Sequence, residues 1–379
     1  MAGKQRYAVK TAIIAAVLLA AAAAAPVFCT AGQNKTEITD AAGRRIEVPL
    51  SPDRVICSGA GCMRLLTYME AEDRAAAVDS MEKTSQGGAD PRPYFLANPQ
   101  LKDLPLSGEF RGRDNPELIA ALDPQPEVIF KTFPNMGHDP EELQKKTGIP
   151  VVVLNYGNLT GHRQDLYRSL RIMGEVLGKK NRAEEIIGFF NEMIDDLAQR
   201  SQDRPGKEDK TCYVGGISYK GPHGVESTQP AYPPFVFTNA RNVAEKHDNP
   251  DNSLSNARVA KEKILSWNPD IIFLDLSSTV SNSGGSALLE LFSDPAYRHL
   301  DAVKKGRVYG VMPYNWYASN FGAVFANAYF TGKILRPERF SDVDPAQKAD
   351  RIFDFLVGEP VFDRIDEMFE GRVFDRIEN

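Results

Sequence analysis

Two similar stretches, "NPELIAALDPQPEVIF" at 115–130 and "KEKILSWNPDIIF" at 261–273, decide how this chain folds. Each begins with an apolar helical turn and ends with Pro, an acid, an aliphatic residue, Ile and Phe. The proline stops the helix because it restricts the residue before it, and the apolar residues that follow predict a buried parallel strand. The chain therefore predicts the same helix–strand unit in each of two similarly built lobes.

The length and the surrounding pattern agree with two lobes. A chain of 379 residues exceeds the roughly 250–300 residues that one hydrophobic core usually serves. Short apolar runs such as "PDRVICSG", "IPVVVLNY" and "GRVYGVM" alternate with helical patterns, which is typical of parallel sheets flanked by helices. We expect an α/β fold of two Rossmann-like lobes joined by one long rigid helix.

The segment 160–200 carries helical periodicity without strands. Apolar residues recur at helical spacing in its second part, at Ile186, Phe190, Met193 and Leu197. A helix continuous to Arg200 would be about 30 Å long at 1.5 Å per residue. The predicted order is signal peptide (1–31), N-terminal α/β lobe (36–158), bridging helix and linker (159–205), C-terminal α/β lobe (206–335) and C-terminal helices (336–379).

The N-terminus reads as an export signal. Three basic residues precede the apolar run "TAIIAAVLLAAAAAAPVF", and small residues up to Ala31 offer a cleavage position. An uncleaved anchor is the alternative, whereas the bulky Phe28 argues against lipidation of Cys29. We expect the mature protein in the periplasm or on the extracytoplasmic face of the membrane.

Charge and cysteine content exclude some classes of partner. Removing the three basic residues of the signal changes the formal charge from −6 to about −9, which argues against nucleic acid and anionic membranes as partners. Cys57 and Cys62 could form a disulfide or remain two buried thiols, and the odd Cys212 rules out a disulfide framework. The five histidines are scattered and form no recognisable zinc motif.

Residues 219–237, "YKGPHGVESTQPAYPPFVF", are rich in Pro and Gly, and we expect them to lack regular structure. A loop of this length normally has a task. His223 and Glu226 are candidate direct metal ligands, although their spacing matches no known metal motif.

Each repeated stretch has a glutamate in the first turn of its expected helix, Glu117 and Glu262. An acid at this position is favoured by the helix dipole by about 0.3–1 kcal/mol, which is one explanation for both.

A resemblance to a known family offers a second explanation for the two glutamates. The pieces "ITDAAGRRIEVPLSPDRVI", "NPELIAALDPQPEVIF", a bridging helix and "VAKEKILSWNPDIIF", in this order, make the chain similar to the class III substrate-binding proteins of ABC importers for iron–siderophore complexes, haem and cobalamin. In that family one surface glutamate on each lobe docks into arginines of the permease, and the matching positions are Glu117 and Glu262.

The resemblance implies a monomeric, non-enzymatic solute-binding protein without a permanent cofactor. It would capture an iron chelate in the cleft between the lobes and deliver it to an ABC permease dimer with its cytoplasmic ATPase. A haem or cobalamin carrier is the alternative within the family. A chelatase- or nitrogenase-like metalloenzyme is the alternative outside it, but the chain lacks a Gly-Xaa-Ser-Xaa-Gly elbow, a P-loop and a cysteine pattern for a metal cluster.

Ligands of open α/β sheets bind beyond the carboxyl ends of the strands, where the cleft loops include 107–113, 131–138, 155–158 and 312–320. Arginine side chains can form bidentate hydrogen bonds to carboxylate or catecholate oxygens, and aromatic side chains suit a planar chelate. Arg113 could instead pair with Asp114 or Glu117, and Trp316 could belong to the core. The predicted ligand-binding residues are Arg111, Arg113, Tyr219, His223, Tyr314, Trp316 and Tyr317.

Overall fold

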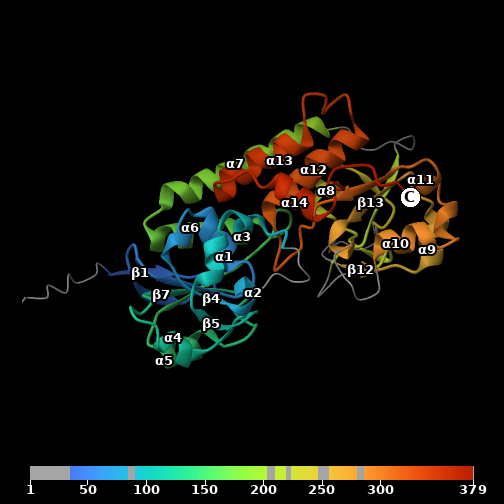
Figure 1. Cartoon of the computed structure of the whole chain (residues 1–379). Coiled ribbons are helices and arrows are strands. Elements are labelled where there is room, and N and C mark those ends of the chain that lie inside the picture. The colour runs from blue at the N-terminus through green and yellow to red at the C-terminus, as the bar shows by residue number, and fades with distance from the viewer. Residues whose placement is uncertain are drawn as a thin grey trace, which may run out of the picture. The chain divides into compact units, whose positions relative to one another are not determined.

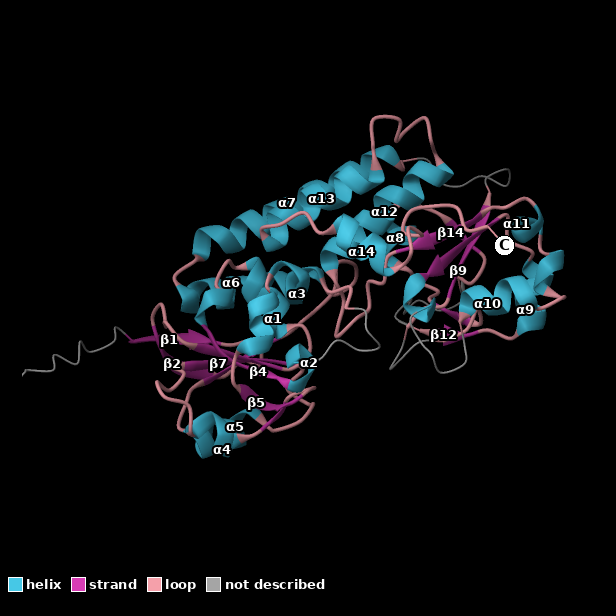
Figure 2. Cartoon of the chain, viewed as in Figure 1, coloured by secondary structure: helices cyan, strands magenta, loops and turns pink. Residues whose placement is uncertain are grey.

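The computed structural model describes residues 35–83, 90–202, 210–218, 223–245, 256–279 and 286–378. The predicted signal peptide and Tyr219 lie outside these residues. Two parallel sheets, each flanked by helices, build two lobes, which confirms the predicted α/β class (Figure 2). The limits given above for the signal, the lobes and the linker stay predictions.

The first lobe contains a six-stranded sheet in the order β6-β5-β4-β3-β7-β8, in which only the edge strand β6 is antiparallel. A hairpin of β1 (Lys35–Thr39) and β2 (Arg45–Pro49) precedes it. The strands of the sheet are β3 (Val55–Ser58), β4 (Ala75–Asp79), β5 (Leu106–Glu109), β6 (Arg113–Asp114), β7 (Val128–Thr132) and β8 (Val151–Leu154).

The helices of this lobe are α1 (Cys62–Tyr68), α2 (Ser80–Lys83), α3 (Pro93–Ala97), α4 (Pro116–Ala120) and α5 (Pro140–Thr147), with 3-10 turns at Glu72–Arg74 and Pro99–Asp103. The Asn115 side chain caps α4 by accepting a hydrogen bond from the Leu118 amide, and Pro116 occupies the first turn, where its missing amide costs nothing. The first repeated stretch thus forms α4 and then β7, whose five residues are all buried.

The second lobe contains a four-stranded parallel sheet in the order β11-β9-β13-β14. Its strands are β9 (Thr211–Gly215), β11 (Arg241–Asn242), β13 (Ile271–Asp275) and β14 (Val308–Val311). Its helices are α8 (Pro233–Phe237), α9 (Lys261–Trp267), α10 (Ala287–Ser293) and α11 (Asp301–Lys304), with 3-10 turns at Leu276–Thr279 and Tyr297–His299. The second repeated stretch forms α9 and then β13, a central strand like β7.

The prediction that 219–237 lacks regular structure is wrong for part of this segment. β10 (Ser227–Thr228) pairs with β12 (Ala257–Arg258), and Pro233–Phe237 form the single-turn helix α8. Proline is tolerated there because it stands in the first turn, where the amide has no partner within the helix.

Two helices cover the segment in which helical periodicity runs without strands. α6 (Arg163–Leu177) ends at Gly178, which adopts a left-handed φ of 71°. α7 (Lys180–Arg200) is continuous over 21 residues and therefore about 31 Å long. The chain then ends in α12 (Phe321–Leu335), α13 (Pro345–Val357) and α14 (Phe362–Met368), which include the amphipathic tail expected from the sequence.

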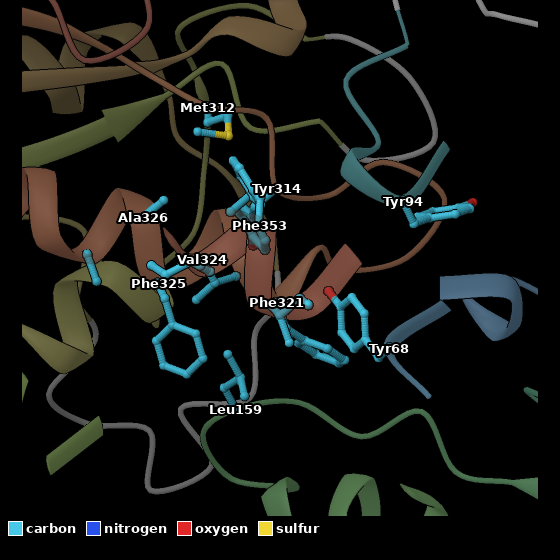
Figure 3. Close-up of a cluster of buried hydrophobic side chains, with 14 of the residues drawn as sticks. Tyr68, Tyr94, Leu159, Met312, Tyr314, Phe321, Val324, Phe325, Ala326 and Phe353 are labelled. Atoms are coloured by element: carbon cyan, nitrogen blue, oxygen red, sulfur yellow. The ribbon is translucent and has the colours of Figure 1, made fainter. Parts of the chain in front are cut away.

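The tail helices lie against α7, as Figure 1 shows for α13. The Phe189 and Phe355 rings stack with centroids 4.1 Å apart, and Arg200 forms an ion pair of 2.6 Å with Asp342. α12 is buried along most of its length, and its Phe321 lies near Tyr68 of the first lobe (Figure 3). α7 is therefore held along its length by residues distant in sequence. No helix among the described residues combines the length and the hydropathy needed to span a bilayer.

Candidate ligand-binding site

A pocket of about 370 Å³ lies where two strands of the first sheet end. The loop after β7, the loop after β8 and the start of α6 form its walls. Both loops belong to the cleft loops expected from the sequence, because parallel strands bring their carboxyl ends to one edge of the sheet. The lining residues are Phe133, Pro134, Asn135, Met136, Asn155, Tyr156, Gly157, Asn158, His162 and Asp165.

Gly157 and Asn158 shape the loop after β8. Gly157 has a φ of 61°, and a Cβ at this position would lie 2.6 Å from the His162 carbonyl oxygen. Asn158 Oδ1 accepts hydrogen bonds from the amides of Thr160 and His162, each 2.9 Å long. Nδ1 of His162 lies 3.3 Å from Asp165 Oδ2. The local sequence therefore fixes His162 and Asp165 in the pocket lining.

Stacked aromatic rings form one wall of the pocket. The Phe133 ring stacks on Tyr156 with centroids 5.7 Å apart, and Tyr156 stacks on Phe321 of α12 at 5.1 Å. Phe133 has a φ of 50°, a left-handed conformation that is strained for a bulky side chain and that clusters at functional sites. The wall extends from the pocket to α12.

A buried ion pair lies beneath the hairpin that carries the two predicted arginines. Lys131 Nζ lies 3.2 Å from Asp114 Oδ2, and the same oxygen accepts a 2.7 Å hydrogen bond from the Ser58 hydroxyl. Because Asp114 is committed to Lys131, the alternative in which it pairs with Arg113 is not realised.

Arg111 and Arg113 are exposed, and among the described residues neither guanidinium has a carboxylate partner. Arg111 adopts a left-handed φ of 62°. The hairpin contacts the pocket loop because the carbonyl of Gly112 accepts a 2.9 Å hydrogen bond from the His138 amide. The backbone of the hairpin that carries both arginines therefore adjoins the loop that lines the pocket.

The loop 312–320 of the second lobe also reaches this region. The Tyr317 hydroxyl donates a hydrogen bond to Asp79, at the carboxyl end of β4, and accepts one of 3.0 Å from the Arg111 amide. Trp316 is half-buried, and its carbonyl accepts a 3.0 Å hydrogen bond from Arg64. The structure thus brings Arg111 and Tyr317 together.

Asp79 was missed by the sequence analysis, although the apolar run "RAAAVD" ends on this acid. Burial, and to a smaller extent the negative charge of Glu82, raise the pKa of Asp79 to about 7. Burial also raises the pKa of the Tyr317 hydroxyl. The donated hydrogen bond from Tyr317 opposes the rise at Asp79 because it stabilises the carboxylate. Arg64, Tyr156 and His162 were missed as well, because nothing in their local sequence marks them.

The other predicted ligand residues lie elsewhere. Tyr314 is only 5% exposed, its hydroxyl donates to Gln229, and it packs in the core (Figure 3). Tyr314 therefore contributes to the packing of the second lobe, and its predicted ligand contact stays a prediction. His223 is exposed, and Glu226 pairs with Arg258 at 3.0 Å. No group of three metal-binding side chains occurs among the described residues, so the metal role of His223 and Glu226 stays a prediction.

The cysteine alternatives can be compared directly. Cys57 and Cys62 are buried, free thiols in this structure, and the Cys62 thiol donates a 3.4 Å hydrogen bond to the Phe130 carbonyl. Burial raises the pKa of the Cys57 thiol.

Glu117 and Glu262 lie in the first turns of α4 and α9, and both side chains are exposed. Neither forms an ion pair within the described residues. Both carboxylates are therefore accessible to a partner.

The sequence of this chain is similar to sequences of known proteins. A model of the periplasmic binding protein family matches residues 55–314. An iron-uptake system-binding protein of Bacillus subtilis is 21% identical over 218 residues, which cover 55% of this chain and 62% of that protein.

Solved structures share the fold. A periplasmic solute binding protein of Veillonella parvula superposes with a TM-score of 0.68 at 18% identity, covering 90% of this chain and 97% of that one. The molybdate periplasmic binding protein MolA of Haemophilus influenzae superposes with a TM-score of 0.63 at 20% identity, covering 86% and 98%. The family model spans more than half of the chain, both lobes included. The chain therefore belongs to the periplasmic binding protein family.

Proposed function

We propose that this protein is the extracytoplasmic solute-binding component of an ABC importer and that its cargo is an anionic iron chelate. The observation that carries the proposal is the pair Arg111 and Arg113. Both guanidinium groups are exposed, lack carboxylate partners among the described residues and stand on a hairpin that contacts the pocket loop. Carboxylate, hydroxamate or catecholate oxygens of a chelate would supply the missing counter-charge.

The pocket suits a chelate of moderate size. Its volume of about 370 Å³ lies in the range of sites for small organic ligands. Phe133 and Met136 offer apolar surface, whereas Asn135, Asn158 and His162 offer polar contacts. A chelate has both kinds of surface, because its organic backbone is apolar and its metal-binding oxygens are charged.

The relatives support the same class of cargo. The Bacillus subtilis protein is an iron-uptake system-binding protein, and the structure of the Haemophilus influenzae protein contains bound molybdate. Both descriptions concern solutes that contain a metal. Haem and cobalamin remain alternative cargoes, and their absorption spectra distinguish them from a ferric chelate.

Replacing both Arg111 and Arg113 with alanine should weaken binding of an anionic ferric chelate by roughly 10- to 100-fold, because one or two charge-assisted hydrogen bonds are lost. The measurement is a titration of the mature protein with a ferric trihydroxamate and a ferric tricatecholate, followed by intrinsic fluorescence and by the charge-transfer absorption of the chelate. The larger loss is expected for the more negatively charged tricatecholate.

Arg45→Ala provides the matched control, because Arg45 is an exposed arginine on β2 and is not among the residues that line the pocket. It should leave both affinities unchanged. Equal affinity of the double variant and the wild-type protein for both chelates would remove the arginines from the site. A wild-type protein that binds molybdate or haem but neither chelate would change the cargo class.

The partner in this proposal is the permease dimer of the importer. The exposed Glu117 and Glu262, one on each lobe, would dock into one basic site on each of two like subunits. A monomeric binding protein on the extracytoplasmic face can present both acids at once, which explains why the helix–strand unit carries a glutamate in both lobes.

A further inference from the structure

Tyr156 takes part in two structures at once. Its ring lines the pocket and stacks on Phe133 and on Phe321. Its hydroxyl donates a 2.7 Å hydrogen bond to the carbonyl of Ser319, in the second-lobe loop 312–320. A ligand that presses on the ring therefore acts on a side chain that also holds this loop.

Arg64 holds the same loop from the first lobe. It belongs to α1 and is 1% exposed. Its Nη2 donates to the carbonyls of Trp316 (3.0 Å) and Tyr317 (3.3 Å), and its Nη1 donates to that of Ser319 (3.1 Å) and to the Tyr156 hydroxyl.

Burial of the Arg64 charge is energetically unfavourable. No carboxylate accepts a hydrogen bond from Arg64 within the described part of the chain, and its Nε is buried without a partner. The guanidinium lies over the Tyr94 and Tyr156 rings, 5.1 and 5.9 Å from their centroids, and all its hydrogen-bond acceptors are neutral oxygens. Burying a cation costs several kcal/mol unless it is compensated, so a buried guanidinium whose hydrogen bonds converge on one loop points to a specific task. That task is to hold three carbonyl groups of one loop in fixed positions.

The loop itself needs such support. Tyr317 and Ala318 are consecutive non-glycine residues with left-handed φ angles of 49° and 68°. Such a pair persists only when the surroundings impose it. The carbonyls that accept hydrogen bonds from Arg64 and Tyr156 belong to Trp316, Tyr317 and Ser319. These residues include or flank the strained pair Tyr317 and Ala318.

We propose that Arg64 and Tyr156 are positioning residues that fix loop 312–320 beside the pocket and link it to the aromatic wall, so that cargo bound against Phe133 and Tyr156 tightens the loop. This inference rests on the proposed cargo function of the pocket. In this arrangement Trp316 and Tyr317 are held near the site through the backbone of their loop. Occupancy of the pocket in the first lobe would then be coupled to the order of this loop in the second lobe.

Tyr156→Phe separates the two roles, since it keeps the stacked ring and removes the hydroxyl. The measurement is hydrogen–deuterium exchange of the amides in 312–320, for the mature protein alone and saturated with the ferric trihydroxamate or tricatecholate that it binds more tightly. In the free protein, exchange in Tyr156→Phe should be about 10-fold faster than in the wild type. On saturation, the wild-type loop should slow by about 5-fold and the variant loop by less than about 2-fold.

Tyr167→Phe is the matched control, because this tyrosine is also buried and its hydroxyl donates a 2.8 Å hydrogen bond to Asn191, within the α6–α7 pair. It should leave exchange of the loop unchanged. Arg64→Lys, which keeps the charge but cannot bridge three carbonyls, should behave like Tyr156→Phe.

Two results would overturn the inference: a loop in Tyr156→Phe as protected as that of the wild type, or a Tyr167→Phe variant that loosens the loop equally. A wild-type protein that binds neither chelate would contradict the proposed cargo and the tightening by cargo. The comparison of the free proteins would still decide whether Arg64 and Tyr156 hold the loop.

Discussion

Import of cargo is expected to fall by roughly 100-fold or more when Glu117 and Glu262 are both replaced by alanine, because truncating one member of a buried interfacial charge pair costs about 2–5 kcal/mol. Affinity for cargo should stay unchanged, since neither residue lines the pocket. Uptake of the radiolabelled ferric chelate into cells that carry the importer measures the first quantity, and titration of the purified variant measures the second.

The control for this experiment uses two other first-turn acids, Glu141 of α5 and Asp301 of α11. Replacing both with alanine removes two first-turn charges, one in each lobe, together with the exposed ion pair between Asp301 and Lys305. Uptake should remain at the wild-type level. Normal uptake by the Glu117→Ala, Glu262→Ala protein, or a loss of cargo binding in it, would rule out a separate docking surface.

Asp275→Asn is expected to stabilise the protein at pH 8 and to have little effect near pH 4. Asp275 ends β13, and its Oδ2 is buried without a hydrogen-bond partner in the described structure. Burial raises the pKa of Asp275 from 3.8 to about 7, although the Ser277 amide, 2.9 Å from Oδ1, favours the carboxylate.

The direction of the pH effect on stability follows from the linkage between proton binding by Asp275 and folding. Below pH 4 the carboxyl is protonated in both the folded and the unfolded chain, so it carries no penalty. Between pH 4 and 7 the unfolded chain loses the proton first, and stability falls as pH rises. Above pH 7 both states are ionised and the penalty is complete, on the order of 4 kcal/mol at most, because one pKa unit corresponds to about 1.4 kcal/mol. The asparagine has no charge to bury.

Urea unfolding at pH 4, 6 and 8 checks this result. Asp294→Asn is an instructive control with the opposite trend, because the Lys261 ammonium, 2.5 Å away, lowers the pKa of Asp294. That variant should lose stability at pH 8 and match the wild type at low pH. An Asp275→Asn protein that is less stable than the wild type at every pH would show that the carboxylate is compensated.

Local patterns in the sequence were sufficient to predict the elements that repeat. The Pro-acid-aliphatic-Ile-Phe runs became β7 and β13, each a central strand, because a short apolar run after a proline has few other ways to be buried. The hairpin of β1 and β2 and the helices of the tail follow equally from residue periodicity. The segment 219–237 was misjudged because proline was counted only as a breaker, whereas it can also open a helix.

The candidate site was predictable at the level of loops more than of residues. The loops after β7 and β8 were expected at the cleft because parallel strands end at one edge. Tyr314 was expected to contact ligand but is buried beside Gln229, because a loop residue can point to the core as readily as to the cleft. Glu226 was expected as a candidate metal ligand, and its carboxylate forms an ion pair with Arg258 of β12, which no local pattern indicated.

The sequence by itself determined the class of fold, the two lobes and the exposed position of Glu117 and Glu262, because these depend on periodicity and on the position of a residue within its own helix. Only the tertiary structure decided that Lys131 pairs with Asp114, so that Arg113 has no carboxylate partner among the described residues, that Asp79 meets Tyr317, and that Arg64 and Tyr156 contact the loop of the other lobe. The physical reason is that these contacts join residues up to 255 positions apart, and their energies depend on burial and on distances that no local pattern records.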